Sequence, residues 1–248
     1  MSARTGSGEV LTIVNKPSGT RLKSSVDRTD RSPERARQDY VKAIYQLGGD
    51  FPVSGADLAR YLAVSRAAVT KSRRILVKEG LVRPASSRTD LIQLTALGRR
   101  LAATMLRRHR LIETFLHRSL KMPLDGLHRQ AEAIEHVISD DVAARLARFL
   151  GNPKLDPHGH PISTKSRGLI PRKSISLAEA EAGSRLRIES IPDRNPSVVR
   201  QLSFHGVLPG LKARVSGRRD GCILLRSGHT THSVPTAVAR LIRVCPSK

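Results

Sequence analysis

The chain has 248 residues, 39% of them hydrophobic, which is enough for one large domain or two to three small domains with buried cores. It carries 44 Lys and Arg against 21 Asp and Glu, a formal net charge of +23, so we expect a polyanionic partner, most commonly nucleic acid. Two cysteines and no apolar run near roughly 18 residues argue against a disulfide framework, a cysteine-type zinc site and a membrane-spanning helix.

Residues 1–33 are rich in Ser, Thr, Gly, Arg and Lys, with one short apolar stretch from Val10 to Val14. This composition predicts a disordered basic tail. It contains no apolar core of a signal peptide, so we expect a cytoplasmic protein without a membrane partner.

Residues 34–98 have the pattern of a winged helix-turn-helix domain. A first helix is expected at 37–47, a short helix at 56–62 and, after a three-residue turn, a helix at 65–79 that carries several Lys and Arg residues. Two short apolar stretches, 81–83 and 91–94, flank a polar turn and predict the wing. The basic residues gather on the element that would enter a DNA groove.

Residues 99–162 are predicted to be helical and to hold the polar groups that suit a metal. A long helix from Ala96 to about His117 carries His109 and Glu113 four positions apart, on one face. Residues 124–149 follow as two helices joined near Ser139. In a helix each residue turns by about 100°. If the first of the two helices is continuous to residue 136, four side chains with nitrogen or oxygen donors therefore lie on one stripe of its surface, namely His128, Glu132, Glu135 and His136.

A mixed set of imidazoles and carboxylates suits manganese, iron(II), zinc or cobalt. The alternative is that these residues form ordinary solvated helix faces, because single His–Glu pairs at this spacing are common. Asp39 lies at the start of the first helix. If it reaches the stripe, a metal would clamp that helix to the helical middle section.

Beyond a basic linker at 163–173 the periodicity changes from helical to alternating. Short apolar strands separated by Gly turns, with one short helix at 197–203, predict a small β-barrel over residues 174–248. The fold class is therefore mainly α with a small β domain.

Residues 37–162 resemble the diphtheria-toxin-repressor (DtxR) family of metal-dependent transcriptional repressors, and within it the manganese transport regulators. Residues 174–244 resemble the SH3-like, FeoA-type domain that many members carry. The resemblance is carried by Gln38-Asp39-Tyr40-Val41-Lys42-Ala43-Ile44, Val64-Ser65 through Glu79-Gly80-Leu81-Val82, Thr95-Ala96-Leu97-Gly98-Arg99, Arg108-His109-Arg110-Leu111-Ile112-Glu113, Glu132-Ala133-Ile134-Glu135-His136 and Asp156-Pro157-His158-Gly159.

The resemblance implies two metal sites, a helical domain that also forms a homodimer, and a double-stranded DNA operator as partner. The implied primary site consists of Asp39, Glu132, Glu135 and His136; the implied ancillary site consists of His109, Glu113 and His128; and the implied DNA-reading positions are Ser65, Arg66, Ala68 and Lys71.

Manganese is the metal we expect, with iron(II) as the alternative. Iron-sensing members have Met at the Asp39 position and Cys at the Glu132 position, whereas this chain has oxygen donors at both. The chain departs from some manganese regulators at Lys42, where they have an acidic residue. For ligands from the barrel domain, the nearest candidates are Asp193 and Asn195. The remaining histidines, including His158 and His160, are expected to be structural or to face solvent.

Three functions remain open from the sequence. The first is a manganese-dependent repressor of metal-uptake genes without a small-molecule substrate. The second is a metalloenzyme in which Glu135 acts as general base beside a metal-bound water; it is disfavoured because the donors suffice to close the coordination shell. The third is a metal-independent protein that binds RNA or chromatin through charge alone.

Overall fold

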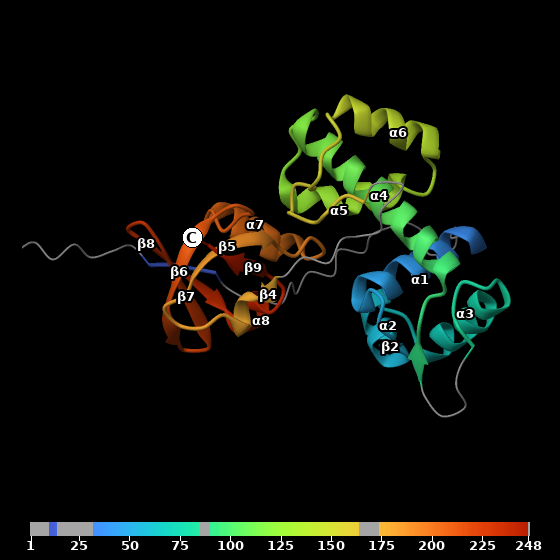
Figure 1. The fold of residues 1–248 in the computed structure, drawn as a ribbon, viewed down its shortest axis with the longest axis horizontal. Coiled ribbons are helices and arrows are strands. Elements are labelled where there is room, and N and C mark those ends of the chain that lie inside the picture. The colour runs from blue at the N-terminus through green and yellow to red at the C-terminus, as the bar shows by residue number, and fades with distance from the viewer. Residues whose placement is uncertain (1–9, 14–31, 85–89, 164–173, 248) are drawn as a thin grey trace, which may run out of the picture.

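The computed structural model describes residues 10–13, 32–84, 90–163 and 174–247, and Figure 1 shows their arrangement. The helices of these ranges are α1 (Pro33–Gly48), α2 (Gly55–Leu62), α3 (Arg66–Lys78), α4 (Ala96–Arg118), α5 (Leu124–Ile134), α6 (Asp140–Phe149), α7 (Pro196–Phe204) and α8 (Thr236–Ala239). The strands are β1 (Val10–Thr12), β2 (Val53–Ser54), β3 (Leu91–Ile92), β4 (Ile175–Ser176), β5 (Arg185–Ser190), β6 (Lys212–Arg219), β7 (Cys222–Ser227), β8 (Thr230–Pro235) and β9 (Arg243–Pro246). Among them, no helix combines the length and the apolar character that crossing a membrane requires.

The helix-turn-helix is formed by α2 and α3. Each helix begins at a serine whose hydroxyl accepts a hydrogen bond from a first-turn backbone N–H: Ser54 from Asp57 at 3.0 Å and Ser65 from Ala68 at 3.1 Å. Apolar side chains of α1, α2, α3 and the wing pack into one core. The wing pairs at its base, where the Arg83 N–H donates to the Gln93 carbonyl at 2.9 Å; residues 85–89 lie outside the described ranges.

Helix α4 joins this unit to the rest of the helical domain. It begins at Thr95, whose hydroxyl accepts a bond from the Gly98 N–H at 3.1 Å. Gly98 is needed for close approach, because a Cβ there would lie 2.1 Å from the Leu81 carbonyl oxygen. The helix buries Ala102 in the core of the helix-turn-helix unit and Ile112 in the next core, so one continuous helix spans both units (Figure 1).

The two helices expected within 124–149 are α5 and α6, and Ser139 begins the second with a bond from the Val142 N–H at 3.2 Å. The expectation that α5 continues through His136 was wrong. The helix ends at Ile134, with Glu135 as its C-cap and His136 in the following turn. These two donors therefore reach the site from an irregular segment and not from one helical stripe.

The C-terminal unit contains a seven-stranded sheet in the order β1-β8-β7-β6-β5-β9-β4. Alternate residues of β5 to β9 point into one apolar core, which α7 and α8 help to cover. The order begins and ends on edge strands, so the SH3-like barrel expected from the sequence is an open sheet in this structure. Figure 1 shows α7 beside α5, which places the C-terminal unit against the helical domain.

The first strand of the sheet comes from the N-terminal segment. Val10–Thr12 pairs in parallel with β8, and Ile13 is only 1% exposed in the core of the C-terminal unit. The prediction of a disordered tail over residues 1–33 is therefore wrong for residues 10–13. The reason is the apolar stretch itself, which gains burial and backbone hydrogen bonds at an open sheet edge. The rest of that tail up to residue 31 lies outside the described ranges.

Candidate metal centre

Two groups of donor side chains lie where α1, α4 and α5 meet. Helix α4 provides His109 and Glu113, both fully buried, and the middle of α5 provides His128. The turn after α5 provides His136, and α1 provides Asp39. The close contact of α4 with both α1 and α5 positions all five residues.

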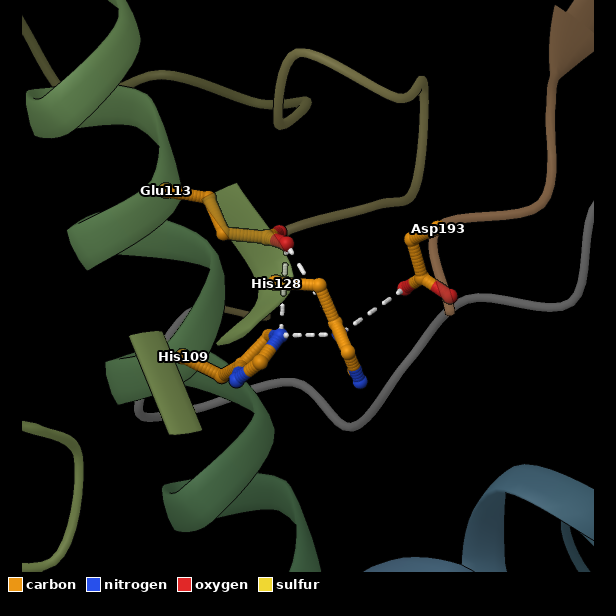
Figure 2. A group of neighbouring side chains, drawn as sticks. All are labelled: His109, Glu113, His128 and Asp193. Atoms are coloured by element: carbon orange, nitrogen blue, oxygen red, sulfur yellow. Dashed lines mark hydrogen bonds and ion pairs between the residues drawn. The ribbon is translucent and has the colours of Figure 1, made fainter. Parts of the chain in front are cut away.

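The predicted ancillary residues gather into one cluster, drawn in Figure 2. His109 Nε2 lies 3.3 Å from Glu113 Oε1 and 3.1 Å from His128 Nδ1. A fourth donor, Asp193, completes the group, with its Oδ2 3.9 Å from His128 Nδ1. Donor atoms of these four residues all lie within 4.8 Å of one another, which is a separation that one ion could bridge.

Asp193 comes from the segment between β5 and α7, in the C-terminal unit. Asn195, the other candidate from that unit, is occupied elsewhere: its side-chain oxygen caps α7 by accepting from the Ser197 N–H at 3.1 Å. The carboxylate is therefore the residue that reaches the ancillary cluster.

The sequence interpretation missed His158. It was expected to be structural or to face solvent. It is completely buried, which agrees with a structural role, but its Nδ1 also lies 3.6 Å from Glu113 Oε1, within reach of the donor groups. With Asp156 and Glu113 it forms a further group of possible ligands. The signal was the compact Asp156-Pro-His-Gly159 turn, in which the Asp156 carboxylate accepts from the His158 N–H at 2.9 Å and fixes the loop.

Three of the four predicted primary residues also come together. His136 Nε2 lies 3.1 Å from Asp39 Oδ1 and 3.5 Å from Glu135 Oε1. The His136 ring is oriented by Gln38, whose Oε1 lies 2.8 Å from Nδ1. Asp39, Glu135 and His136 thus join α1 to the end of α5 through donor atoms within 4.8 Å of one another.

Glu132, the fourth predicted primary ligand, lies between the two groups. Its Oε1 is 3.4 Å from His128 Nε2 and 3.7 Å from the ammonium of Lys42. Lys42 is itself buried and also forms an ion pair with Glu135. A lysine from α1 therefore neutralises two of the carboxylates assigned to the primary site.

Burial and neighbouring charges shift the pKa values of the buried groups of this centre in opposite directions. Burial lowers the pKa of His109, but the carboxylates of Glu113 and Glu135 outweigh burial and raise it to about 10. Burial raises the pKa of Glu113, yet His109 and His158 hold it well below its ordinary value. For Lys42, burial lowers the pKa and Glu135 and Glu132 more than compensate, so its pKa is raised. The buried carboxylates thus require positive charge close by.

The geometry around Glu113 fits a cation better than a set of hydrogen bonds. Imidazole nitrogens of His109, His158 and His128 lie 3.3, 3.6 and 4.0 Å from its Oε1, all beyond the usual range of about 2.7–3.2 Å. Among the described residues, neither carboxylate oxygen of Glu113 has a hydrogen bond of good geometry. Nitrogen and oxygen donors of this kind suit a divalent ion such as manganese, iron or zinc.

Comparison with known proteins decides the family. Residues 95–164 match the model described as iron dependent repressor, metal binding and dimerisation domain, and residues 175–246 match the FeoA domain. The chain is 31% identical over 224 residues to the iron-dependent repressor IdeR of Mycobacterium leprae, covering 83% of this chain and 94% of the relative. The chain belongs to the diphtheria-toxin-repressor family.

Solved structures agree with this assignment. A manganese-dependent transcriptional repressor in complex with manganese superposes with a TM-score of 0.76 at 32% identity, covering 85% of this chain and all of that chain. The repressor ScaR with bound Zn²⁺ gives a TM-score of 0.74 at 29% identity and covers 85% of this chain and 99% of that chain. Like these relatives, this member of the diphtheria-toxin-repressor family is a metal-dependent transcriptional repressor and not an enzyme, so the metalloenzyme alternative is dropped.

The helix predicted from the sequence to read DNA corresponds to α3. Arg66 and Lys71 are exposed on it, and Ala68 is half-buried. Ser65 is exposed at its start, where its oxygen accepts the capping bond and its hydroxyl hydrogen stays available as a donor. The basic surface of α3 faces outward, as contact with DNA phosphates requires.

An apolar surface remains open within the segment matched by the dimerisation model. On α6, Val142 and Phe149 stand seven positions apart, on one face, and are 48% and 70% exposed. The Phe149 ring packs edge-on against Phe115 of α4, with ring centroids 6.1 Å apart. Exposed apolar groups of this size mark interaction surfaces.

Proposed function

We propose that this chain is a manganese-activated repressor that binds an operator on double-stranded DNA as a homodimer, with iron(II) as the alternative metal. The observation that carries the proposal is the meeting of Asp39, from the first helix of the DNA-reading unit, with Glu135 and His136 beyond α5. The DNA-reading unit and the helical domain both contribute donors to one site. Metal binding at that site would therefore affect how the two units are oriented relative to each other.

In this proposal the primary metal is held by Asp39, Glu135 and His136, with Glu132 beside them, and the ancillary metal by His109, Glu113, His128 and Asp193. When bound, the metal supplies the positive charge that lets carboxylates from α1 and from the end of α5 stay together. The side chains themselves set the orientation: Gln38 holds the His136 ring, and the Lys42 ammonium screens Glu135. A ligand that prefers one orientation shifts the population toward it.

The preference for manganese rests on the donor atoms. Neither predicted site includes sulfur, and the two cysteines, Cys222 and Cys245, lie in the C-terminal sheet. Oxygen and nitrogen donors suit manganese, whereas sulfur ligands favour softer ions. The relatives compared above include both an iron-dependent repressor and a manganese-dependent one, so we use the donor chemistry to choose between the two metals.

DNA binding would be performed by the two α3 helices of a dimer joined through the face that contains Val142 and Phe149. Two reading helices fit successive major grooves when they lie about 34 Å apart. Ser65, Arg66, Ala68 and Lys71 would lie in the groove, with Arg66 and Lys71 contributing the charge.

The test is operator binding, titrated anaerobically with manganese, with iron(II) and with a chelator. We expect tight binding with manganese, weaker binding with iron(II) and none with chelator. His136→Ala should abolish the response, whereas His229→Ala, at an exposed position between β7 and β8, should leave it unchanged. Equal binding with metal and with chelator would contradict the proposal, and stronger activation by iron(II) would replace manganese with iron.

A further inference from the structure

The segment between β5 and α7 contacts two other parts of the molecule through two neighbouring side chains. Asp193 joins the ancillary cluster, with its Oδ2 3.9 Å from His128 Nδ1 and 3.8 Å from His160 Nδ1. The next residue, Arg194, turns toward the DNA-reading unit. Its guanidinium carbon lies 3.8 Å from the ring centroid of Tyr61 on α2, and its Nη1 donates to the Tyr61 carbonyl at 3.1 Å.

The segment is firmly held on the side of the helical domain. Ile191 is completely buried, and its N–H donates to the His158 carbonyl at 3.0 Å. Asn195 caps α7, and Val199 of that helix belongs to the same apolar core as residues of α4 and α5. Asp193 and Arg194 therefore lie on a fixed piece of backbone, not on a free loop.

Tyr61 is equally well placed to receive the contact. It lies on the last turn of α2, immediately before the turn that leads to α3. Its hydroxyl donates to Gln46 Oε1 of α1 at 3.0 Å, and its ring packs against the core of the DNA-reading unit. A contact that restrains Tyr61 therefore also restrains the position of the helix-turn-helix.

Arg194 and Tyr61 also line a small cavity of about 90 Å³, together with Asp39, Lys42 and His136 of the primary site. The contact consequently lies beside the primary site while its neighbour Asp193 belongs to the ancillary one. Consecutive α-carbons are about 3.8 Å apart, so Arg194 cannot move far when Asp193 is fixed.

We propose that Arg194 is a positioning residue, which uses the C-terminal domain to hold the helix-turn-helix when Asp193 is fixed at the ancillary cluster. The proposal rests on the proposed function, because it assigns a purpose to the ancillary metal. Fixing Asp193 favours the state in which Arg194 stacks on Tyr61, and by reciprocity the stacked state favours the ancillary ion. The planar guanidinium is required, since it stacks on the ring and donates to the carbonyl at once.

The test compares Arg194→Gln with Arg200→Gln in the full-length protein. Arg200 is a matched control: it lies in the same domain and makes an interdomain ion pair, with Asp125 of α5, at 2.6 Å, but it does not touch the DNA-reading unit. Amide hydrogen exchange of residues 54–78 is measured with and without manganese, beside the number of manganese ions bound per chain and the operator affinity.

In the manganese-loaded protein we expect Arg194→Gln to increase exchange in α2 and α3 several-fold and to weaken operator binding about five- to tenfold, with manganese stoichiometry unchanged. Arg194→Lys should recover little of the loss. Arg200→Gln should leave exchange in 54–78 as in the wild type. Asp193→Asn should increase the same exchange, and the double variant Asp193→Asn/Arg194→Gln should be no worse than the stronger single variant, because the two act in series.

Wild-type exchange in Arg194→Gln, or additive effects of the two substitutions, would overturn the proposal. Failure of the proposed function gives a different result: wild-type protein would then bind operator equally with manganese and with chelator. The exchange experiment reads the contact of Arg194 with Tyr61 without DNA, so the two failures are distinguishable.

Discussion

Replacing Lys42 tests how the negative charge of the primary-site carboxylates is neutralised when no metal is bound. Its buried ammonium forms ion pairs with Glu135 and Glu132, at the position where a divalent ion would neutralise the same carboxylates. Replacing Lys42 with Met removes the charge and keeps most of the apolar stem. We expect opposite effects on the two states: the metal-free protein loses stability, and the affinity for manganese rises.

The magnitude follows from what remains around the carboxylates. Removing one partner of a buried ion pair costs about 3–5 kcal/mol. The lower end applies, because Glu135 keeps His109 at 2.5 Å and His136 at 3.5 Å, while the Glu132 side chain is 42% exposed. A loss of about 3 kcal/mol lowers Tm by about 6–12 °C in a protein of this size.

The gain in metal affinity has the same electrostatic origin. A single and a double positive charge about 5 Å apart repel by about 7 kcal/mol at an effective dielectric constant near 20. Much of this is avoided in the wild type when the lysine swings away, so we expect a gain of about tenfold, or about 1.4 kcal/mol.

Thermal unfolding in chelator and manganese affinity by competition with a chromophoric chelator measure the two effects. Lys212→Met is the matched control, since that lysine is exposed on β6 in the C-terminal sheet. If Lys42→Met is as stable as the wild type in chelator, or binds manganese more weakly, then the Lys42 ammonium is not the group that neutralises these carboxylates in the metal-free protein.

Three further predictions concern pH, DNA and assembly. In the metal-free protein the pKa values of His109 and His158 are raised from 6.5 to about 10 and about 9, so their protonated forms stabilise the fold fully below pH 6.5. This stabilisation is lost as the pH rises toward 9 and 10; Tm should fall across that window, and less steeply in His109→Gln. Lys71→Gln should weaken operator binding and reduce the slope of log affinity against log salt by about 0.9, measured by anisotropy titrations at several salt concentrations; an unchanged slope would remove Lys71 from the phosphate contacts. Phe149→Asp should convert the dimer to a monomer in light scattering after gel filtration, whereas Phe204→Asp, at an 84% exposed position on α7, should remain dimeric.

The helices could be predicted from the sequence because their limits are set locally. Ser54, Ser65, Thr95 and Ser139 each begin a helix by accepting a hydrogen bond from a backbone N–H of its first turn, as their positions before apolar periodic stretches indicate. The pairs at spacing four on α4 and α5 likewise predict which side chains share a face. The C-terminal limit of α5 was missed, because no Gly or Pro marks it.

The parts that could not be predicted depend on contacts between distant segments. Asp193 reaches His128 across 65 positions of sequence, and His158 reaches Glu113 across 45, so no local spacing identifies either pair. Lys42 was noticed only as a departure from the family, and its ion pair with Glu135 depends on how α1 lies against the turn after α5. Long-range docking of this kind is decided by packing, which periodicity does not encode.

Strand β1 has a consequence for how the polypeptide holds together when its backbone is cut. Because residues 10–13 pair with β8 and bury Ile13, the helical part of the chain, residues 32–163, is attached to the C-terminal sheet at both of its ends, once through the hydrogen bonds of β1 and once through the covalent chain at 164–173. A protease that cleaves between 164 and 173 should therefore yield two fragments that migrate together under native conditions and separate only in denaturant. Protein that begins at Ser32 would lack this second attachment, and its fragments would be held by the packing of α7 on the helical domain and by Asp193, Arg194 and Arg200, so they should separate at a lower denaturant concentration.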